Sequence, residues 1–172
     1  VDEAAAIETL TIDSLSLGAL KGLENCTGLK ELTVTDSQVQ DLSFLSGLTS
    51  LTSLTLSGNK IENLSGLPNS LQTLDLSGNT DLEDLSELSG LSNLKTLNVS
   101  GTAVADVSKV PASVTDLDIS DTSVVDLGQL RTTNLESLKA SGNSIEDISS
   151  VAAMTKLTYL DLSNNSISVI PD

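Results

Sequence analysis

Histidine and tryptophan are absent from this chain of 172 residues, and cysteine, methionine, tyrosine and phenylalanine occur once each. Without histidine there is no imidazole to act as a general base or to activate a serine, so the commonest route to acid–base and nucleophilic catalysis is missing. A single cysteine excludes an internal disulfide and a cysteine-based metal cluster. The sequence therefore predicts neither an enzyme nor a metalloprotein, and it predicts no cofactor.

Basic residues are also scarce. The chain has 8 Lys and Arg against 24 Asp and Glu, for a formal net charge of −16. A surface this acidic repels nucleic acid and anionic membranes, whose attraction depends on clustered Lys and Arg. A basic or neutral protein is easier to accommodate. The charge either steers a basic ligand from a distance or serves solubility alone.

Long apolar runs are missing as well, because no stretch approaches the ~20 residues that span a bilayer. No charged segment followed by an apolar one opens the chain. The first residue is Val1, so we expect a mature fragment whose signal peptide was removed or never included. Cys26 falls in an apolar slot of the first repeat and is predicted to be a small buried hydrophobe.

What the chain does contain is a repeated apolar framework. Aligned on L-x-x-L-x-L-x-x-N-x-I, repeats 1 to 8 start at residues 7, 29, 51, 71, 94, 114, 135 and 157. These starts are 20 to 23 residues apart, and repeat 4 carries an extra residue near Thr80 and Asp81, predicted to form a small bulge. A fixed period of this length indicates a solenoid. We expect a single α/β domain over residues 1–172, with the last repeat truncated.

The L-x-L portion of each repeat predicts a short strand. Side chains alternate along a strand, so Leu54 and Leu56 should point inward and Thr55 outward. Stacked strands then form a concave parallel sheet with rungs about 4.8 Å apart. Each repeat relies on its neighbours to bury its apolar face.

The slot after the strand favours asparagine, whose amide satisfies backbone groups in the turn. In four repeats it holds Asn59, Asn79, Asn143 and Asn165. In three others it holds Ser37, Thr102 and Thr122, which can make fewer hydrogen bonds to the backbone, and in repeat 1 it holds Leu15. The return path often opens on Asp, an apolar residue and Ser, and each Asp is expected to cap a helical turn. These Asp residues are Asp41, Asp84, Asp106 and Asp147. About ten residues remain there, which predicts 3₁₀ or single α turns and a shallow arc.

This framework resembles the internalin and SDS22-like class of leucine-rich repeat proteins. The stretch from Leu20 to Leu29, LKGLENCTGL, is similar to the entry into such arrays in bacterial surface proteins. The resemblance implies protein binding across the concave sheet and a secreted or cell-surface adhesion protein. Exposed aromatics are frequent at such interfaces, whereas here Tyr159 stands alone on the predicted concave face. The class also includes cytoplasmic regulatory subunits, which stay an alternative.

The predicted concave face divides into two halves. Counted from the first Leu, its outward positions are the third, fifth and seventh, and repeats 1 to 4 fill them mainly with Thr and Ser. The second half gathers Asp116, Asp118, Lys139, Tyr159 and Asp161. An amphipathic ring among charges is a plausible recognition patch, so we expect the partner to bind there. The alternative is that Lys139 simply neutralises its neighbours Asp118 and Asp161.

Other functions fit the residues less well. Asp116 and Asp118 share one face, about 7 Å apart, but an open face has no pocket to raise the pKa of one carboxyl for sugar hydrolysis. Acidic rows favour Ca²⁺, yet no calcium-binding motif is present and no metal site is predicted. Ice or carbohydrate binding would want a flat, uniform Thr and Ser lattice, which Asp and Lys interrupt.

Two further expectations concern the whole array. A passive spacer in a larger adhesin is the bland alternative to a binding module. Leu162, Ile167 and Ile170 belong to a last turn without a recognisable cap, so we expect a fragment, a missing cap or end-to-end association. The triplets at Asn25, Asn63, Asn98 and Asn164 match glycosylation sequons but do not decide the location.

Overall fold

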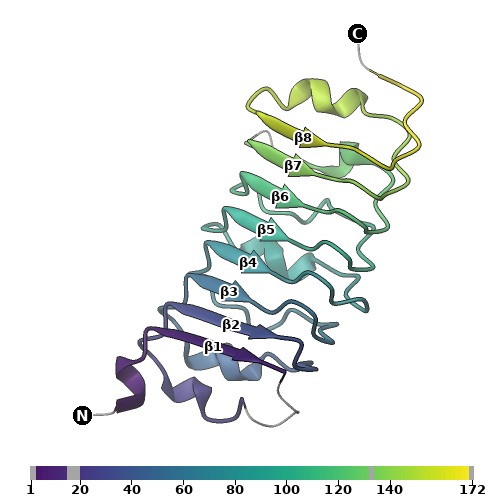
Figure 1. Cartoon of the computed structure of the whole chain (residues 1–172). Helices are drawn as coiled ribbons and strands as arrows, with labels where there is room; N and C mark the ends of the chain where they lie inside the picture. Colours follow the sequence, from purple (N-terminus) through teal and green to yellow (C-terminus); the bar gives the residue numbers. More distant parts are fainter. Residues whose placement is uncertain (1–2, 15–19, 132–133, 171–172) are drawn as a thin grey trace.

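The computed structural model describes residues 3–14, 20–131 and 134–170. One sheet runs through the molecule, and its strands follow one another in chain order (Figure 1). The strands are β1 (Thr9–Asp13), β2 (Glu31–Thr35), β3 (Ser53–Thr55), β4 (Thr73–Asp75), β5 (Thr96–Asn98), β6 (Asp116–Asp118), β7 (Ser137–Lys139) and β8 (Tyr159–Asp161). Each predicted repeat contributes one strand.

Every neighbouring pair of strands is parallel and in the predicted register, with Leu54 between Leu32 and Leu74. The stack is nearly straight in Figure 1, consistent with a shallow arc. Leu54 and Leu56 are fully buried, whereas Thr55 between them is half-exposed. The α/β solenoid predicted from the repeat pattern is therefore confirmed.

The core is one continuous column of apolar side chains between the sheet and the return segments. Burial is complete through the middle of the array and falls at the C-terminal end. The strand leucine is 0 % exposed at Leu54, Leu97 and Leu138 but 37 % exposed at Leu160. Each repeat is thus covered by the next one.

A left-handed residue ends each strand segment. At the eighth position of the repeats φ lies between +49° and +69°, in Ser14, Asp36, Gly58, Gly78, Gly101, Asp121, Gly142 and Asn164. Gly, Asn, Asp and Ser are the residues expected there, because they tolerate this region best. Backbone amides of this column bond to the seventh-position carbonyl of the following repeat, as from Gly78 N to Ser100 O at 2.8 Å.

The asparagine slot works as predicted. Asn59 is 5 % exposed; its Oδ1 accepts from the amides of Ser37 and Val39 at 3.1 and 3.0 Å, and its Nδ2 donates to the carbonyls of Val34 and Leu56. Asn79, Asn143 and Asn165 make equivalent bonds. Thr102 makes one such bond, to Val99 O, within its own repeat. Leu15 lies outside the described residues.

The convex side carries short 3₁₀ helices, as expected for so short a return path. They are η1 (Glu3–Ala6), η2 (Leu23–Asn25), η3 (Ser43–Gly47), η4 (Ser86–Gly90), η5 (Leu127–Gln129) and η6 (Ser149–Ala153). Repeats 3 and 5, residues 51–70 and 94–113, are fully described and contain no helix. Each is 20 residues long and has a proline in the return segment, Pro68 or Pro111. None of the helices in the described segments is long and apolar enough to cross a membrane.

The Asp residues of the return path accept from the serine two residues ahead. Where a helix follows, Asp41, Asp84 and Asp147 lie one residue before its N-cap, so the predicted N-cap position is wrong by one residue. Asp41 Oδ1 accepts from the amide of Ser43 at 2.8 Å and its Oδ2 accepts from the Ser43 hydroxyl at 2.8 Å. These two bonds lower the pKa of Asp41 from its ordinary value of 3.8. Asp84, Asp106 and Asp147 bond in the same way and also have a lowered pKa. After Asp106 the capped segment is a turn without a helix.

The remaining local predictions concern the bulge and the cysteine. Leu82 N donates to Asn79 O at 3.1 Å across the extra residue, so the insertion forms a turn on the flank of repeat 4 as predicted. Cys26 is a free thiol, 6 % exposed. It is the small buried hydrophobe expected from its slot.

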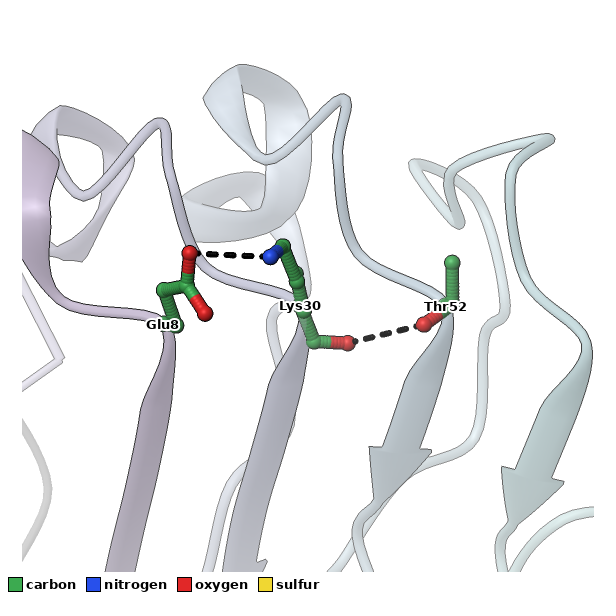
Figure 2. A network of polar contacts seen from close by, with 3 residues as sticks. All are labelled: Glu8, Lys30 and Thr52. Atoms are coloured by element: carbon green, nitrogen blue, oxygen red, sulfur yellow. Dashed lines mark hydrogen bonds and ion pairs between the residues drawn. The ribbon is translucent and has the colours of Figure 1, made fainter.

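A column of second-position residues runs beside the sheet, just before each strand. Lys30 Nζ lies 2.8 Å from Glu8 Oε1, and Thr52 donates its hydroxyl to Lys30 O (Figure 2). The Glu8 and Lys30 side chains are 63 % and 56 % exposed, so this ion pair contributes little to stability.

Candidate partner-binding face

The five candidate residues come from three successive strands at the C-terminal end of the sheet (Figure 1). Lys139 of β7 pairs in register with Asp118 of β6 and with Asp161 of β8. Asp116 and Tyr159 lie one column away, on either side of Ser137. The fold therefore brings all five side chains to one face, as their spacing predicts.

The exposure of these residues is uneven. Tyr159, the first residue of β8, is 50 % exposed. Asp116 and Lys139 are exposed as well, whereas Asp118 and Asp161 are partly buried. Asp116 Oδ2 accepts from the Thr115 hydroxyl at 2.8 Å. A ring that keeps half its surface in water can bury that area against a partner.

Lys139 interacts with both of its fifth-position neighbours. Its Nζ lies 3.5 Å from Asp118 Oδ2, with side-chain exposures of 51 % and 20 %. The Ser163 amide first, then the Ser163 hydroxyl and the positive charge of Lys139, lower the pKa of Asp161 from its ordinary value of 3.8. The partial neutralisation considered for the sequence is thus present on this face.

A role that the sequence reasoning missed belongs to the fifth-position carboxylates. Asp118 Oδ1 accepts from the amide of Ser120 at 3.0 Å, and Asp161 Oδ1 accepts from that of Ser163 at 2.9 Å. Asp75 and Asn98 do the same with the serine two residues ahead. Such turns end the strand locally. The signal was available, since Asp or Asn, an apolar residue and Ser is the motif already noticed at the convex caps.

The bond to the serine amide fixes the orientation of the two carboxylates in the site. One carboxylate oxygen of Asp118 and of Asp161 is committed to the backbone, so each side chain is held in a fixed orientation. Fixed side chains lose less entropy when a partner binds. The same geometry explains two of the sequon-like triplets, because Asn63 and Asn98 accept from the amides of Ser65 and Ser100.

Two hollows among the described residues lie away from this face. One is lined by Leu64, Leu67 and Gly90 beside η4, and the other by Glu62, Asp81 and Asp84 on the flank. Asp116 and Asp118 line neither. In the described segments no group of three or more His, Cys, Asp and Glu side chains is arranged to hold a metal ion.

Comparison with known families identifies the framework. The family model described as leucine-rich repeats, in two copies, matches residues 27–69, 70–111 and 133–172. The chain belongs to the leucine-rich repeat family. No curated protein sequence is similar enough to count as a relative.

Three solved structures with similar leucine-rich repeats come from bacteria. Internalin C2 of Listeria monocytogenes is 32 % identical, with a TM-score of 0.85 over 96 % of this chain and 75 % of that one. YopM of Yersinia enterocolitica is 29 % identical, with a TM-score of 0.68 over 86 % of this chain and 32 % of that one. Internalin F of Listeria monocytogenes, at 21 % identity and a TM-score of 0.67, covers 98 % of this chain and 68 % of that one and shares the fold.

The resemblance to leucine-rich repeat proteins of the bacterial internalin type is therefore confirmed. Proteins of this type are protein-interaction scaffolds rather than known enzymes. Their leucine-rich repeats supply the scaffold, and the outward side chains differ from one protein to another. What this chain binds has to be argued from its own outward residues.

Proposed function

We propose that this chain, acting as one domain, is a recognition module that binds a protein partner through the C-terminal half of its concave face. The observation that carries the proposal is the half-exposed ring of Tyr159 beside carboxylates held by the backbone. Tyr is enriched at the centres of protein interfaces, and polar groups form the rim around such centres. Asp116, Asp118, Lys139 and Asp161 would surround it.

Charge favours a basic partner. The chain carries a formal net charge of −16, and Lys139 offsets only part of the negative charge on the candidate face. Long-range attraction of this kind raises the association rate and weakens as salt is added. Catalysis is no part of the proposal, because an open sheet face offers no water-excluding pocket.

The location is proposed by analogy. The similar structures belong to internalins of Listeria monocytogenes and to YopM of Yersinia enterocolitica, which supports a secreted or surface-attached bacterial adhesion protein. End-to-end association is a further part of the proposal. It is motivated by Leu160, Val169 and Ile170, which are 37 %, 46 % and 74 % exposed at the C-terminal end.

The test compares two matched triple variants. The first is Asp118→Asn, Tyr159→Ser and Asp161→Asn, in which asparagine keeps the strand-ending bond, as Asn98 does in β5. The second, Thr11→Ser, Thr33→Ser and Thr55→Ser, alters the hydroxyl half of the same face. Proteins captured by the wild-type chain are identified, and the affinity of each is then measured for all three chains by titration calorimetry.

We expect a partner whose affinity falls at least tenfold with the first variant and is unchanged with the second. Circular dichroism checks that both variants fold. A partner that binds all three chains equally would place the site elsewhere. A chain that captures nothing at low or high salt would be a spacer, and the proposal would fail.

A further inference from the structure

Asparagine bonds tie successive repeats together along the turn side of the array. In each case the amide oxygen accepts from a backbone amide of the preceding repeat. Asn59 bonds to Val39 N and Asn79 to Ile61 N, which links repeats 2 to 4. Asn143 bonds to Thr122 N and Asn165 to Ile145 N, which links repeats 6 to 8. We name these sets the N-terminal unit (residues 29–93) and the C-terminal unit (residues 114–170).

Repeat 5 lies between the units and interrupts this ladder. Its slot residue, Thr102, donates to Val99 O of its own repeat at 2.7 Å. In the described segments no slot side chain bonds across from repeat 4 to repeat 5 or from repeat 5 to repeat 6. Between repeats 4 and 5 the cause is the insertion in repeat 4. Leu82 N donates to Asn79 O within its own repeat, so it needs no acceptor from residue 102.

The convex side has no helix at repeat 5, as is also the case at repeat 3. Helix η2 packs against η3, and η5 packs against η6. Between these pairs, η4 is flanked by repeats 3 and 5, which have no helix. Repeat 5 therefore presents a thinner convex layer to its neighbours than the repeats at either end.

The core of repeat 5 is also thinner. Four of its buried positions after the strand leucine are valine, namely Val99, Val104, Val107 and Val110. Repeat 4 has leucine in each equivalent place, Leu76, Leu82, Leu85 and Leu88. Since apolar stabilisation scales with buried area, the interfaces of repeat 5 contribute less. The backbone ladder of β4, β5 and β6 continues across these interfaces, with bonds such as Gly101 N to Ser120 O at 2.9 Å. Bonds outside the sheet also cross them, from the Ser113 hydroxyl to Leu91 O and from Val107 N to Gln129 Oε1.

We infer that the solenoid divides at repeat 5 into two units that open and close independently of each other. In a repeat array the stability is a sum of repeat and nearest-neighbour terms, so the array separates where the neighbour terms are smallest. The C-terminal unit carries the five candidate residues; on the proposed function, a partner would then protect residues 114–170 and leave residues 29–93 unchanged.

Hydrogen exchange of the full chain, followed by mass spectrometry, tests the division without any partner. The matched variants are Leu54→Ala and Leu138→Ala, because both leucines are the 0 % exposed central residue of their strands. Each substitution should speed exchange in its own unit by roughly thirtyfold or more. The other unit should keep the wild-type rates. If either substitution speeds both units equally, the array is one cooperative unit and the inference is wrong.

A second variant introduces a slot asparagine that can bond from repeat 6 to repeat 5. Thr122→Asn places an amide oxygen opposite Val104 N, in the relation that Asn59 has to Val39 N. Exchange in residues 94–113 should slow several-fold, and residues 29–93 should be unaffected. An equal slowing in both regions would overturn the division. Loss of partner binding in the triple variant bears on the proposed function alone, so the two ideas fail separately.

Discussion

The N-terminal and C-terminal units share one framework and differ in what they expose. Each pairs a left-handed aspartate with a glycine of the next repeat, Asp36 with Gly58 and Asp121 with Gly142. Each has successive asparagines in the slot after the strand. The outward columns differ, because the fifth position carries Thr33, Thr55 and Asp75 in one unit and only charged side chains in the other.

Burial differs between the units only at the last strand. The strand leucines of β2, β3 and β4 are at most 1 % exposed, whereas Leu160 of β8 is 37 % exposed. The shared positions are those that close the turn and fill the core, and the variable ones face outward. The comparison teaches that the framework determines the fold and leaves the outward columns free to carry recognition.

The largest expected effect comes from removing a slot asparagine, and it should differ between the units. Asn59→Ala leaves the buried amides and carbonyls around residue 59 without a hydrogen-bond partner. It should lower the free energy of unfolding by about 3–4 kcal/mol. Asn165→Ala should cost about 1–2 kcal/mol, because Asn165 is only half-buried and water replaces part of its bonds. Urea unfolding measures both.

Asn59→Thr serves as the control for this pair. Because it copies the residue at Thr102, it should keep the bond within the repeat and lose about half as much stability as Asn59→Ala. Equal losses of stability for Asn59→Ala and Asn165→Ala would contradict the idea that burial determines how much each slot asparagine contributes to stability.

The next effect concerns the left-handed column. Gly101→Ala has room, with the nearest atoms 3.6 Å from the added carbon, so it should cost about 1–2 kcal/mol through the backbone alone. In Gly142→Ala the added Cβ also clashes with the Asp121 carboxylate. This clash should increase the loss of stability by about 1 kcal/mol. Thermal unfolding measures the difference. Asp121→Gly combined with Gly142→Ala should remove it, and a persistent difference would exclude the carboxylate as the cause.

The ion pairs of the two units should have small effects. Lys30→Met removes the pair with Glu8, and Lys139→Met removes the pair with Asp118. Both lysines are more than half exposed, so each substitution should change stability by about 0.5 kcal/mol or less. The effect should shrink further at high salt. A loss that persists at 1 M salt, a concentration at which the Debye length is about 3 Å, would indicate lost packing instead.

The smallest effect at neutral pH is expected at the convex caps, where the titration is visible only in acid. The Ser86 hydroxyl and amide lower the pKa of Asp84 below 3.8. A carboxyl with a lowered folded pKa stabilises the fold above its ordinary pKa, and this contribution is lost as the pH falls through the folded value. Wild type should therefore lose more stability between about pH 5 and pH 2 than Asp84→Asn does.

The chain offers a natural counterpart for this measurement. Asn63 makes the same turn with Ser65 and does not titrate. Asn63→Asp should add acid sensitivity, and Asp84→Asn should remove it, with both variants close to wild type at pH 7. Parallel pH profiles for all three chains would show that these bonds do not contribute to acid unfolding.

The repeat period predicted the architecture because the framework leucines of the inner repeats are also core residues. Strand positions, register, the asparagine slot and the 3₁₀ turns all followed from it. The five candidate residues were also placed correctly on one face. Whether they bind a partner stays a prediction, since nothing in the fold itself requires an outward side chain to have a ligand.

Two features were not predicted, for different reasons. The strand-ending bonds of Asp118 and Asp161 went unnoticed because their charge drew attention to partners rather than to their own backbone. The gap at Thr102 depends on the neighbouring repeat, through the bond between Leu82 and Asn79. The Thr in the slot of repeat 5 is explained by the extra residue in repeat 4. An alignment that compares repeats one position at a time does not show such a dependence between neighbouring repeats.

The extra residue near Thr80 and Asp81 has a consequence for how such a chain can change. It is taken up in a turn on the flank, and the strands on either side, β4 and β5, keep the register of the others. The added residue at this flank therefore leaves the register of the strands and the alignment of the outward columns unchanged. A repeat of this kind can grow longer at the flank while its outward side chains stay in line with those of its neighbours.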